Sequence, residues 1–206
     1  MEPTSGLPLR ADAARNVQRI VEAAHAVFGR GGLTVPMDEI AAEAGVGIAT
    51  LYRRFPNKES LVKAVLDQRF TDLIVPALER ARRETDTRKA VLLALEAAVS
   101  CASREQHTIA AASNIGAMTM DLAWRFFEPV GDLIRRGQEQ GVFRDDLVAQ
   151  DVPRIVLMLV GTLPSFEAGS DGWRRYVELV MDALAPTGTT AELPPPMPVR
   201  DHSPHL

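Results

Sequence analysis

Cysteine is almost absent from this chain, and long apolar runs are missing altogether. Cys101 is the only cysteine among 206 residues, so an intrachain disulfide is excluded, as is usual for a reducing compartment. No apolar run reaches the roughly 18 residues that a membrane span needs. The N-terminal MEPTSGLPLR also lacks the apolar core of a signal peptide. We therefore expect a cytoplasmic protein without membrane contact.

An excess of positive charge is also missing. The net charge is −4, with 46% apolar and 24% charged residues, a composition typical of globular proteins. Residues 1–86 hold 12 basic and 12 acidic side chains, whereas residues 87–206 hold 11 and 15. Neither part is basic as a whole, so any contact with nucleic acid must come from a local patch. Non-specific affinity should then be modest and sensitive to salt.

The common catalytic and metal-binding patterns do not occur. There is no Gly-x-Ser-x-Gly elbow, no His-Glu-x-x-His and no Walker loop. Gly45-Val46-Gly47 follows a helix pattern and lacks a third glycine, so it does not make a dinucleotide fingerprint. His202 and His205 lie in a proline-rich end, and His25 is expected to be structural. We expect no enzyme activity, no cofactor and no metal site.

Apolar residues recur at helical spacing along most of the chain, and no stretch alternates with the period of a strand. The pattern predicts an all-α fold: an N-terminal three-helix domain followed by a helical bundle. The expected helices are residues 11–29, two short helices within residues 37–55, and then residues 58–84, 90–103, 108–118, 120–140, 150–166 and 173–185. Pro76 should kink or split the fourth of these, because proline removes a helix hydrogen bond.

Two short helices joined by glycine stand out at residues 37–58, MDEIAAEAGVGIATLYRRFPNK. Ile40 and Ala44 give the first helix an apolar face, and Gly45 permits a sharp turn after it. Leu51 and Phe55, four residues apart, should face inward from the second helix. This is the pattern of a helix-turn-helix, whose second helix enters a DNA major groove.

The same stretch resembles the signature of the TetR family of bacterial transcriptional regulators. The resemblance covers about residues 12–65 and depends on fixed spacings among these residues: Ile40, Ala41, Ala44, Gly45, Val46, Thr50, Leu51, Tyr52, Phe55, Lys58 and Leu61. It implies a homodimer that binds a palindromic DNA operator and responds to a small-molecule effector. The DNA contacts expected on this basis are Ile48, Ala49, Thr50, Tyr52, Arg53, Arg54 and Lys58.

Two parts of the motif depart from the family pattern. Gly47 and Ile48 stand at turn positions where relatives often carry polar groups, and Pro36 and Asp38 replace hydroxyl or basic contacts. Because Asp38 would repel a phosphate, contacts from the first helix of the motif are not expected. The second helix and Lys58 should carry more of the binding.

Four segments follow from this organisation. Residues 1–9 are expected to be disordered, residues 10–57 to bind DNA, and residues 58–185 to bind an effector and dimerise. Residues 186–206, rich in proline, should not pack. For dimerisation the last two helices supply apolar residues beyond what one small domain buries: Leu157, Val160, Gly161, Tyr176, Val177 and Val180.

An apolar effector cavity is expected in the second domain, because methionine and aromatic side chains gather there. Its predicted lining is Ala97, Cys101, Ile115, Met118, Trp124, Phe127, Met158 and Phe166. Each is alternatively an ordinary core residue, and Cys101 a buried structural thiol. We expect a repressor released by a hydrophobic or aromatic effector; an activator, a ligand-independent regulator and a helical-bundle enzyme or carrier are the alternatives.

Overall fold

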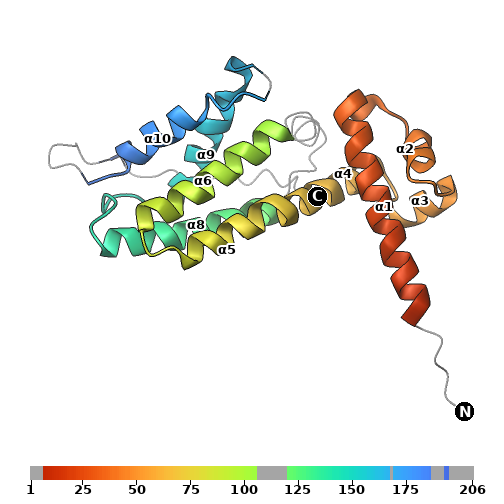
Figure 1. The fold of residues 1–206 in the computed structure, drawn as a ribbon, viewed down its shortest axis with the longest axis horizontal. Helices are drawn as coiled ribbons and strands as arrows, with labels where there is room; N and C mark the ends of the chain where they lie inside the picture. The colour runs from red at the N-terminus through yellow and green to blue at the C-terminus, as the bar shows by residue number, and fades with distance from the viewer. Residues whose placement is uncertain (1–6, 106–119, 168, 187–192, 195–206) are drawn as a thin grey trace, which may run out of the picture. The chain divides into compact units, whose positions relative to one another are not determined.

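The computed structural model describes residues 7–105, 120–167, 169–186 and 193–194, and every regular element within them is helical (Figure 1). The predicted all-α fold is therefore confirmed. None of the described helices is both long and apolar enough to pass through a bilayer. The chain forms two compact units: unit 1 holds residues 1–69 and 105–118, and unit 2 holds residues 70–104 and 119–206. The units thus divide later in the sequence than the expected boundary after residue 57.

Unit 1 is built on one long helix. Its elements are α1 (Leu7–Gly31), the short 3-10 turn η1 (Gly32–Thr34), α2 (Met37–Glu43), α3 (Ile48–Arg54) and α4 (Lys58–Arg69). Helix α1 starts earlier than residue 11, and α4 packs on it together with α2. The fully buried side chains come from all four helices and include Ile20, Phe28, Ile40, Leu51, Leu61 and Val65. The apolar stripes predicted from helical spacing therefore form this core.

A buried carboxylate in unit 1 is paired with a histidine. Glu105 is only 5% exposed, and its two carboxylate oxygens lie 2.9 and 3.0 Å from Nε2 of His25 on α1. A buried polar group without a partner is costly, so this contact makes the burial of Glu105 tolerable. His25 has the structural role expected from the sequence.

The helix predicted over 58–84 is interrupted before Pro76. Helix α4 ends at Arg69, a π-helical turn η2 spans Phe70–Ile74, and α5 (Val75–Arg83) follows with Pro76 in its first turn. Pro76 has no N–H for the carbonyl of Asp72, four residues earlier, so regular α geometry cannot continue through this point. The expected kink therefore takes the form of a wider turn, a feature that apolar periodicity does not reveal.

Unit 2 packs its remaining helices around α6 (Thr87–Arg104). They are α8 (Met120–Glu139), α9 (Asp151–Gly161), the 3-10 turn η3 (Leu163–Ser165) and α10 (Arg174–Ala183). The helix expected over 108–118 lies outside the described residues. On α8, Phe126 is buried, whereas Trp124, expected to face inward, is 46% exposed. At the start of α8, the side of the helix that faces the core is therefore not the predicted side.

Ion pairs hold α10 against α6 along one side. Arg88 of α6 donates to Glu178 and Asp182 at 3.1 and 2.7 Å, and Arg174 donates to Glu96 at 2.5 Å. Trp173, which precedes α10, is 2% exposed, and Met181 is 1% exposed. These contacts fix which side of α10 remains uncovered.

Leu193, one of the described residues near the end of the chain, bonds to Asp146 within unit 2. The Leu193 N–H donates to Oδ2 of Asp146 at 2.9 Å, and Arg144 binds the same carboxylate at 2.5 and 2.8 Å. The guanidinium of Arg144, and then the Leu193 N–H, lower the pKa of Asp146 to about 2. Leu193 is 41% exposed, and residues 187–192 and 195–206 lie outside the described ones, so the expectation that nothing beyond residue 186 packs stays a prediction.

Candidate nucleic-acid interface

The turn between α2 and α3 closes with a Schellman motif at Gly45. Gly45 has φ of +63°, and its N–H donates to the Ala42 carbonyl at 3.0 Å. The Val46 N–H donates to the Ala41 carbonyl, also at 3.0 Å. This pair of bonds satisfies the last carbonyls of α2, and the left-handed conformation is one that glycine adopts without strain. The glycine expected to end the first helix of the motif is therefore the residue that does so.

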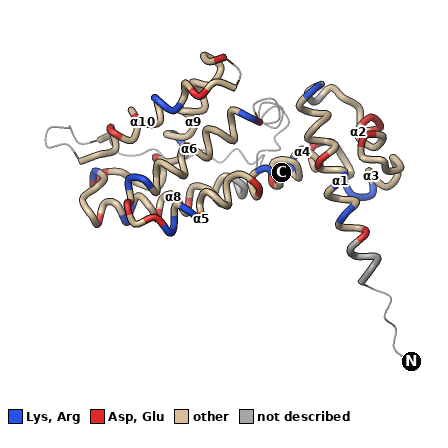
Figure 2. The backbone as a smooth tube through the Cα atoms, viewed as in Figure 1, with Lys and Arg blue, Asp and Glu red and all other residues tan. Residues whose placement is uncertain are grey.

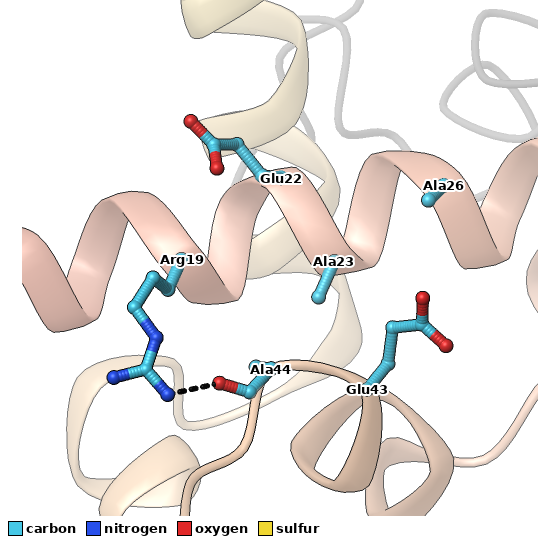
Figure 3. A pocket seen from close by; sticks show the side chains of 6 residues that line it. All are labelled: Arg19, Glu22, Ala23, Ala26, Glu43 and Ala44. Atoms are coloured by element: carbon cyan, nitrogen blue, oxygen red, sulfur yellow. Dashed lines mark hydrogen bonds between the residues drawn. The ribbon is translucent and has the colours of Figure 1, made fainter.

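Arg19 of α1 clamps the same turn from outside (Figure 3). Its Nη2 donates to the carbonyls of Ala44 and Gly45 at 2.6 and 3.1 Å. The cation lies at the C-terminal end of α2, where the helix dipole favours positive charge. A hollow of about 310 Å³ lies beside it, with Glu22 and Glu43 on its walls. Arg19 thereby connects α1 directly to the turn that sets the direction of α3.

Helix α3 has a buried side and an exposed side. Leu51 is fully buried, and Phe55, directly after the helix, is 7% exposed. The exposed side carries Ile48 at 42%, Tyr52 at 48%, and the exposed residues Ala49, Arg53 and Arg54, with Thr50 half-buried. Six of the seven predicted DNA contacts are therefore on α3, and five of these are exposed together.

Lys58 differs from the other predicted contacts. Its Nζ donates to the Val35 carbonyl at 2.7 Å and is half-buried. The ammonium thus ties the start of α4 to the chain before α2. Asn57 caps α4, because its Oδ1 accepts the Ser60 N–H at 2.8 Å, as expected from the sequence.

Charges of opposite sign lie on the two helices of the motif. Asp38 and Glu39 occupy the first turn of α2, whereas Arg53 and Arg54 occupy the last turn of α3 (Figure 2). Glu43 of α2 pairs with Arg30 at 3.1 Å. A polyanion is attracted to the α3 side and repelled by the start of α2.

The predicted dimer residues form an uncovered apolar face on α9 and α10. Leu157 is 66% exposed and Tyr176 is 42% exposed, with Gly161 exposed and Val160 and Val180 half-buried. Val177 is the exception: it is fully buried within unit 2, so it belongs to the core. Leu179 at 53% and Met158 at 61% extend this face and were not among the predicted dimer residues.

The predicted effector-site residues are spread over several elements. Ala97 and Cys101 are half-buried on α6, and the rings of Trp124 and Phe127 meet edge-to-face at 6.4 Å on α8. Phe166 instead lies against Tyr176, with ring centroids 5.7 Å apart, and Met158 points to the surface. Ile115 and Met118 lie outside the described residues.

A hollow of about 330 Å³ in unit 2 contains none of the predicted effector-site residues. It lies between α5 and α8, and Arg125 stacks on the Phe70 ring beside it, 4.7 Å from the ring centroid. Leu78 and Pro129 also line it. Among the described residues, no three His, Cys, Asp or Glu side chains gather closely enough to hold a metal ion.

Sequence reasoning missed Arg19 and Leu179. Arg19 lies on the polar side of an amphipathic helix, and nothing in its spacing distinguishes it from a solvated cation. Leu179 does have a signal, because it follows Tyr176 by three residues and so shares its face of α10.

This fold, with a short exposed helix after a glycine turn, defines a helix-turn-helix regulator. A model of the bacterial regulatory proteins of the tetR family matches residues 20–65. An HTH-type transcriptional regulator of Staphylococcus aureus is 43% identical over 68 residues; the match spans 32% of this chain and only 36% of that protein.

Solved structures extend the similarity to almost the whole chain. The TetR transcription regulatory protein from Mycobacterium vanbaalenii is 30% identical, with a TM-score of 0.60, over 86% of this chain and 99% of that chain. A transcriptional regulator from Saccharomonospora viridis in complex with choline shares the fold at 21% identity, with a TM-score of 0.67, over 81% and 95% of the two chains. The protein belongs to the TetR family of transcriptional regulators.

Proposed function

We propose that the protein is a homodimeric, ligand-responsive repressor that binds a palindromic operator through α3. One observation carries this proposal: Ile48, Tyr52 and Arg53 are exposed together on a short helix whose opposite side is buried. A helix of this kind leaves its side chains free for base edges while its own core holds it in place. DNA as the partner also implies the cytoplasm of a bacterium as the site of action.

The contacts divide by chemistry. The guanidinium of Arg53 can donate to O6 and N7 of guanine as a fork, and the hydroxyls of Thr50 and Tyr52 suit phosphate oxygens. Lys58 is proposed to contact a phosphate at the edge of the groove. Arg54, Ile48 and Ala49 complete the surface proposed to contact DNA.

A second copy of the chain is the proposed partner of the face on α9 and α10. Leu157, Met158 and Leu179 are each more than half exposed, an arrangement that is costly in water and favourable against another apolar surface. Val160, Gly161, Tyr176 and Val180 lie on the same two helices. A two-fold axis through this face produces a four-helix interface and gives the dimer two copies of α3, one for each half-site of the operator.

A small hydrophobic or aromatic molecule is the proposed effector. The half-buried Ala97, Cys101 and Phe127 of unit 2 are proposed to line its site. The S. viridis regulator holds choline, a small molecule, within the same fold. An effector that prefers the state unable to bind DNA by a few kcal/mol is enough to release the operator.

A mobility-shift experiment with the DNA upstream of the protein's own gene tests this function. Wild-type protein should retard that duplex and not a scrambled one of the same length, and Arg53→Ala should weaken the retardation. Equal retardation of both duplexes at physiological salt would contradict sequence-specific binding. A promoter reporter then separates repression from activation, since a repressor lowers expression until the effector is added.

A further inference from the structure

Ile48 is the one large apolar side chain exposed at the start of α3. It is 42% exposed, and the extended residue Gly47 directly precedes it. The neighbouring Ala49 is exposed and small, whereas both cations of α3 lie in its last turn. Helix α3 is therefore divided along its length into an apolar first turn and a cationic last turn.

Ile48 is not one of the core residues of unit 1. Leu51 and Phe55 supply the buried contacts of α3, and Ile48 is β-branched, a type with low helix propensity. A single exposed apolar residue is common on protein surfaces. The position of Ile48 is more informative, because the first residues of a recognition helix are those that meet base edges.

An isoleucine in the major groove has only one attractive partner. Base edges there present hydrogen-bond donors and acceptors, except for the C5 methyl group of thymine. The Ile48 side chain has no polar atom, so it gains nothing from an amino group or a carbonyl oxygen. Packing against a methyl group removes apolar surface of both partners from water.

We propose that Ile48 reads the C5 methyl group of a thymine at one symmetric pair of operator positions. The inference rests on the proposed function and adds a specificity to it. It uses the side chain of Ile48 and no backbone group. Arg53, further along α3, reads or anchors a neighbouring position, so the methyl contact and the cation contact are separable.

The experiment starts from a duplex selected from a random-sequence pool by repeated binding to the full chain. Each symmetric pair of thymines is then replaced by deoxyuridine, which removes the methyl group and keeps base pairing. Affinity is measured by fluorescence anisotropy for wild type, Ile48→Val and Ile48→Ala. Circular dichroism melting checks that the exposed substitutions leave the fold intact.

Deoxyuridine at one pair should weaken wild-type binding about fourfold per half-site, the value of burying one methyl-sized group. Ile48→Val keeps a branched apolar group and should keep this dependence, whereas Ile48→Ala should lose it. Equal sensitivity in wild type and Ile48→Ala, or no sensitivity at any thymine, overturns the inference while specific binding survives. If no duplex is enriched at all, the proposed function fails, and this inference fails with it.

Discussion

Among the described residues, the exposed face of α3 and the exposed face of α9 and α10 differ in chemistry. The face of α3 combines Ile48 and Tyr52 with two arginines, whereas the face of α9 and α10 exposes Leu157, Leu179 and other apolar groups. Cations and hydroxyls suit a hydrated polyanion, and exposed large apolar side chains suit another protein surface. Exposure alone therefore does not identify a partner, but the polarity of the exposed face does.

The two faces are also held differently. Helix α3 is short and is oriented by a turn that Arg19 and Gly45 fix. Helix α10 is anchored by ion pairs from Arg88 and Arg174 on the side away from its apolar residues. Substitutions can therefore disturb one face while leaving the other intact.

The largest effect should follow Leu157→Glu, which puts a charge into the apolar face at a residue 66% exposed. We expect a monomer in sedimentation velocity at micromolar concentration, because an unpaired charge cannot be buried cheaply. Operator affinity should fall by at least about a hundredfold, since one half-site loses the avidity of two. Ile48→Glu is the matched control: this variant should remain a dimer and still lose operator binding. If the Leu157→Glu and Leu179→Glu variants both remain dimeric, the dimer interface must lie on another face.

Arg53→Ala should act on the other face alone. We expect a loss of about 1–3 kcal/mol in operator binding and a flattened preference at one base position per half-site. The measurement is affinity for a set of single-base operator variants. Arg83→Ala, which removes an exposed cation from unit 2, should leave both quantities unchanged. If the base preference shifts in Arg54→Ala and stays intact in Arg53→Ala, the two arginines have exchanged roles.

Lys58→Ala should weaken binding to operator and scrambled DNA alike. The slope of affinity against salt should fall by about one per subunit, as for a lost phosphate contact. Loss of the bond to the Val35 carbonyl adds a destabilisation of about 1 kcal/mol, visible in urea unfolding. Lys63→Ala, on an exposed position of α4, is the control for charge alone. A change of sequence preference in Lys58→Ala would show that this residue reads bases.

Arg19→Ala should loosen the turn without removing a DNA contact. We expect about 1 kcal/mol lower stability, because two carbonyls lose a charged donor, and weaker operator binding with an unchanged salt slope. Arg19→Lys should recover part of the lost stability and part of the lost operator affinity. Gly45→Ala should destabilise the same turn, because residue 45 has a φ of +63° and the added Cβ would lie 2.9 Å from Arg19 Nη2. The two substitutions should therefore be non-additive; additive losses, or a lower salt slope in Arg19→Ala, would reject the clamp.

Asp146→Asn should have the smallest effect on stability, present above about pH 4 and lost in acid. Because the pKa of Asp146 is lowered from 3.8 to about 2, the ionised carboxylate stabilises the fold above pH 4. That contribution is lost as the pH falls from about 4 through about 2. The difference in melting temperature between wild type and Asp146→Asn should shrink over this window. Removing residues 188–206 deletes the Leu193 donor and should narrow the difference as well; a constant difference from pH 6 to 2 would argue against the assignment.

The helix-turn-helix was predictable because its evidence is local. Leu51 and Phe55 face inward through helical spacing, and Gly45 is placed by the backbone angle that the turn needs. Both properties depend only on residues that are close together in the chain, so they can be predicted from the sequence. The predicted exposure of Arg53 and Tyr52 follows from the same phase.

The contacts between distant residues were not predictable in this way. Arg19 and Lys58 both donate to carbonyls at least 23 residues away, and a backbone carbonyl carries no sequence signal. The phase of the later helices was also uncertain: Val177 is core although Tyr176 beside it is exposed. Apolar composition predicts which helices pack. It does not predict which side of a helix faces inward when apolar residues lie on several sides.

The π turn at Phe70–Ile74 lies where the chain passes from unit 1 to unit 2, and the number of residues in this turn matters for how the chain continues. A π turn takes up one residue more than an α turn, and each residue of an α-helix advances the direction of the next side chain by about 100°. The chain from α4 to α5 is therefore helical with one residue in surplus. Because Pro76 prevents regular α geometry at this point, the surplus residue lets the helical path continue into α5, and deleting it should destabilise the start of α5.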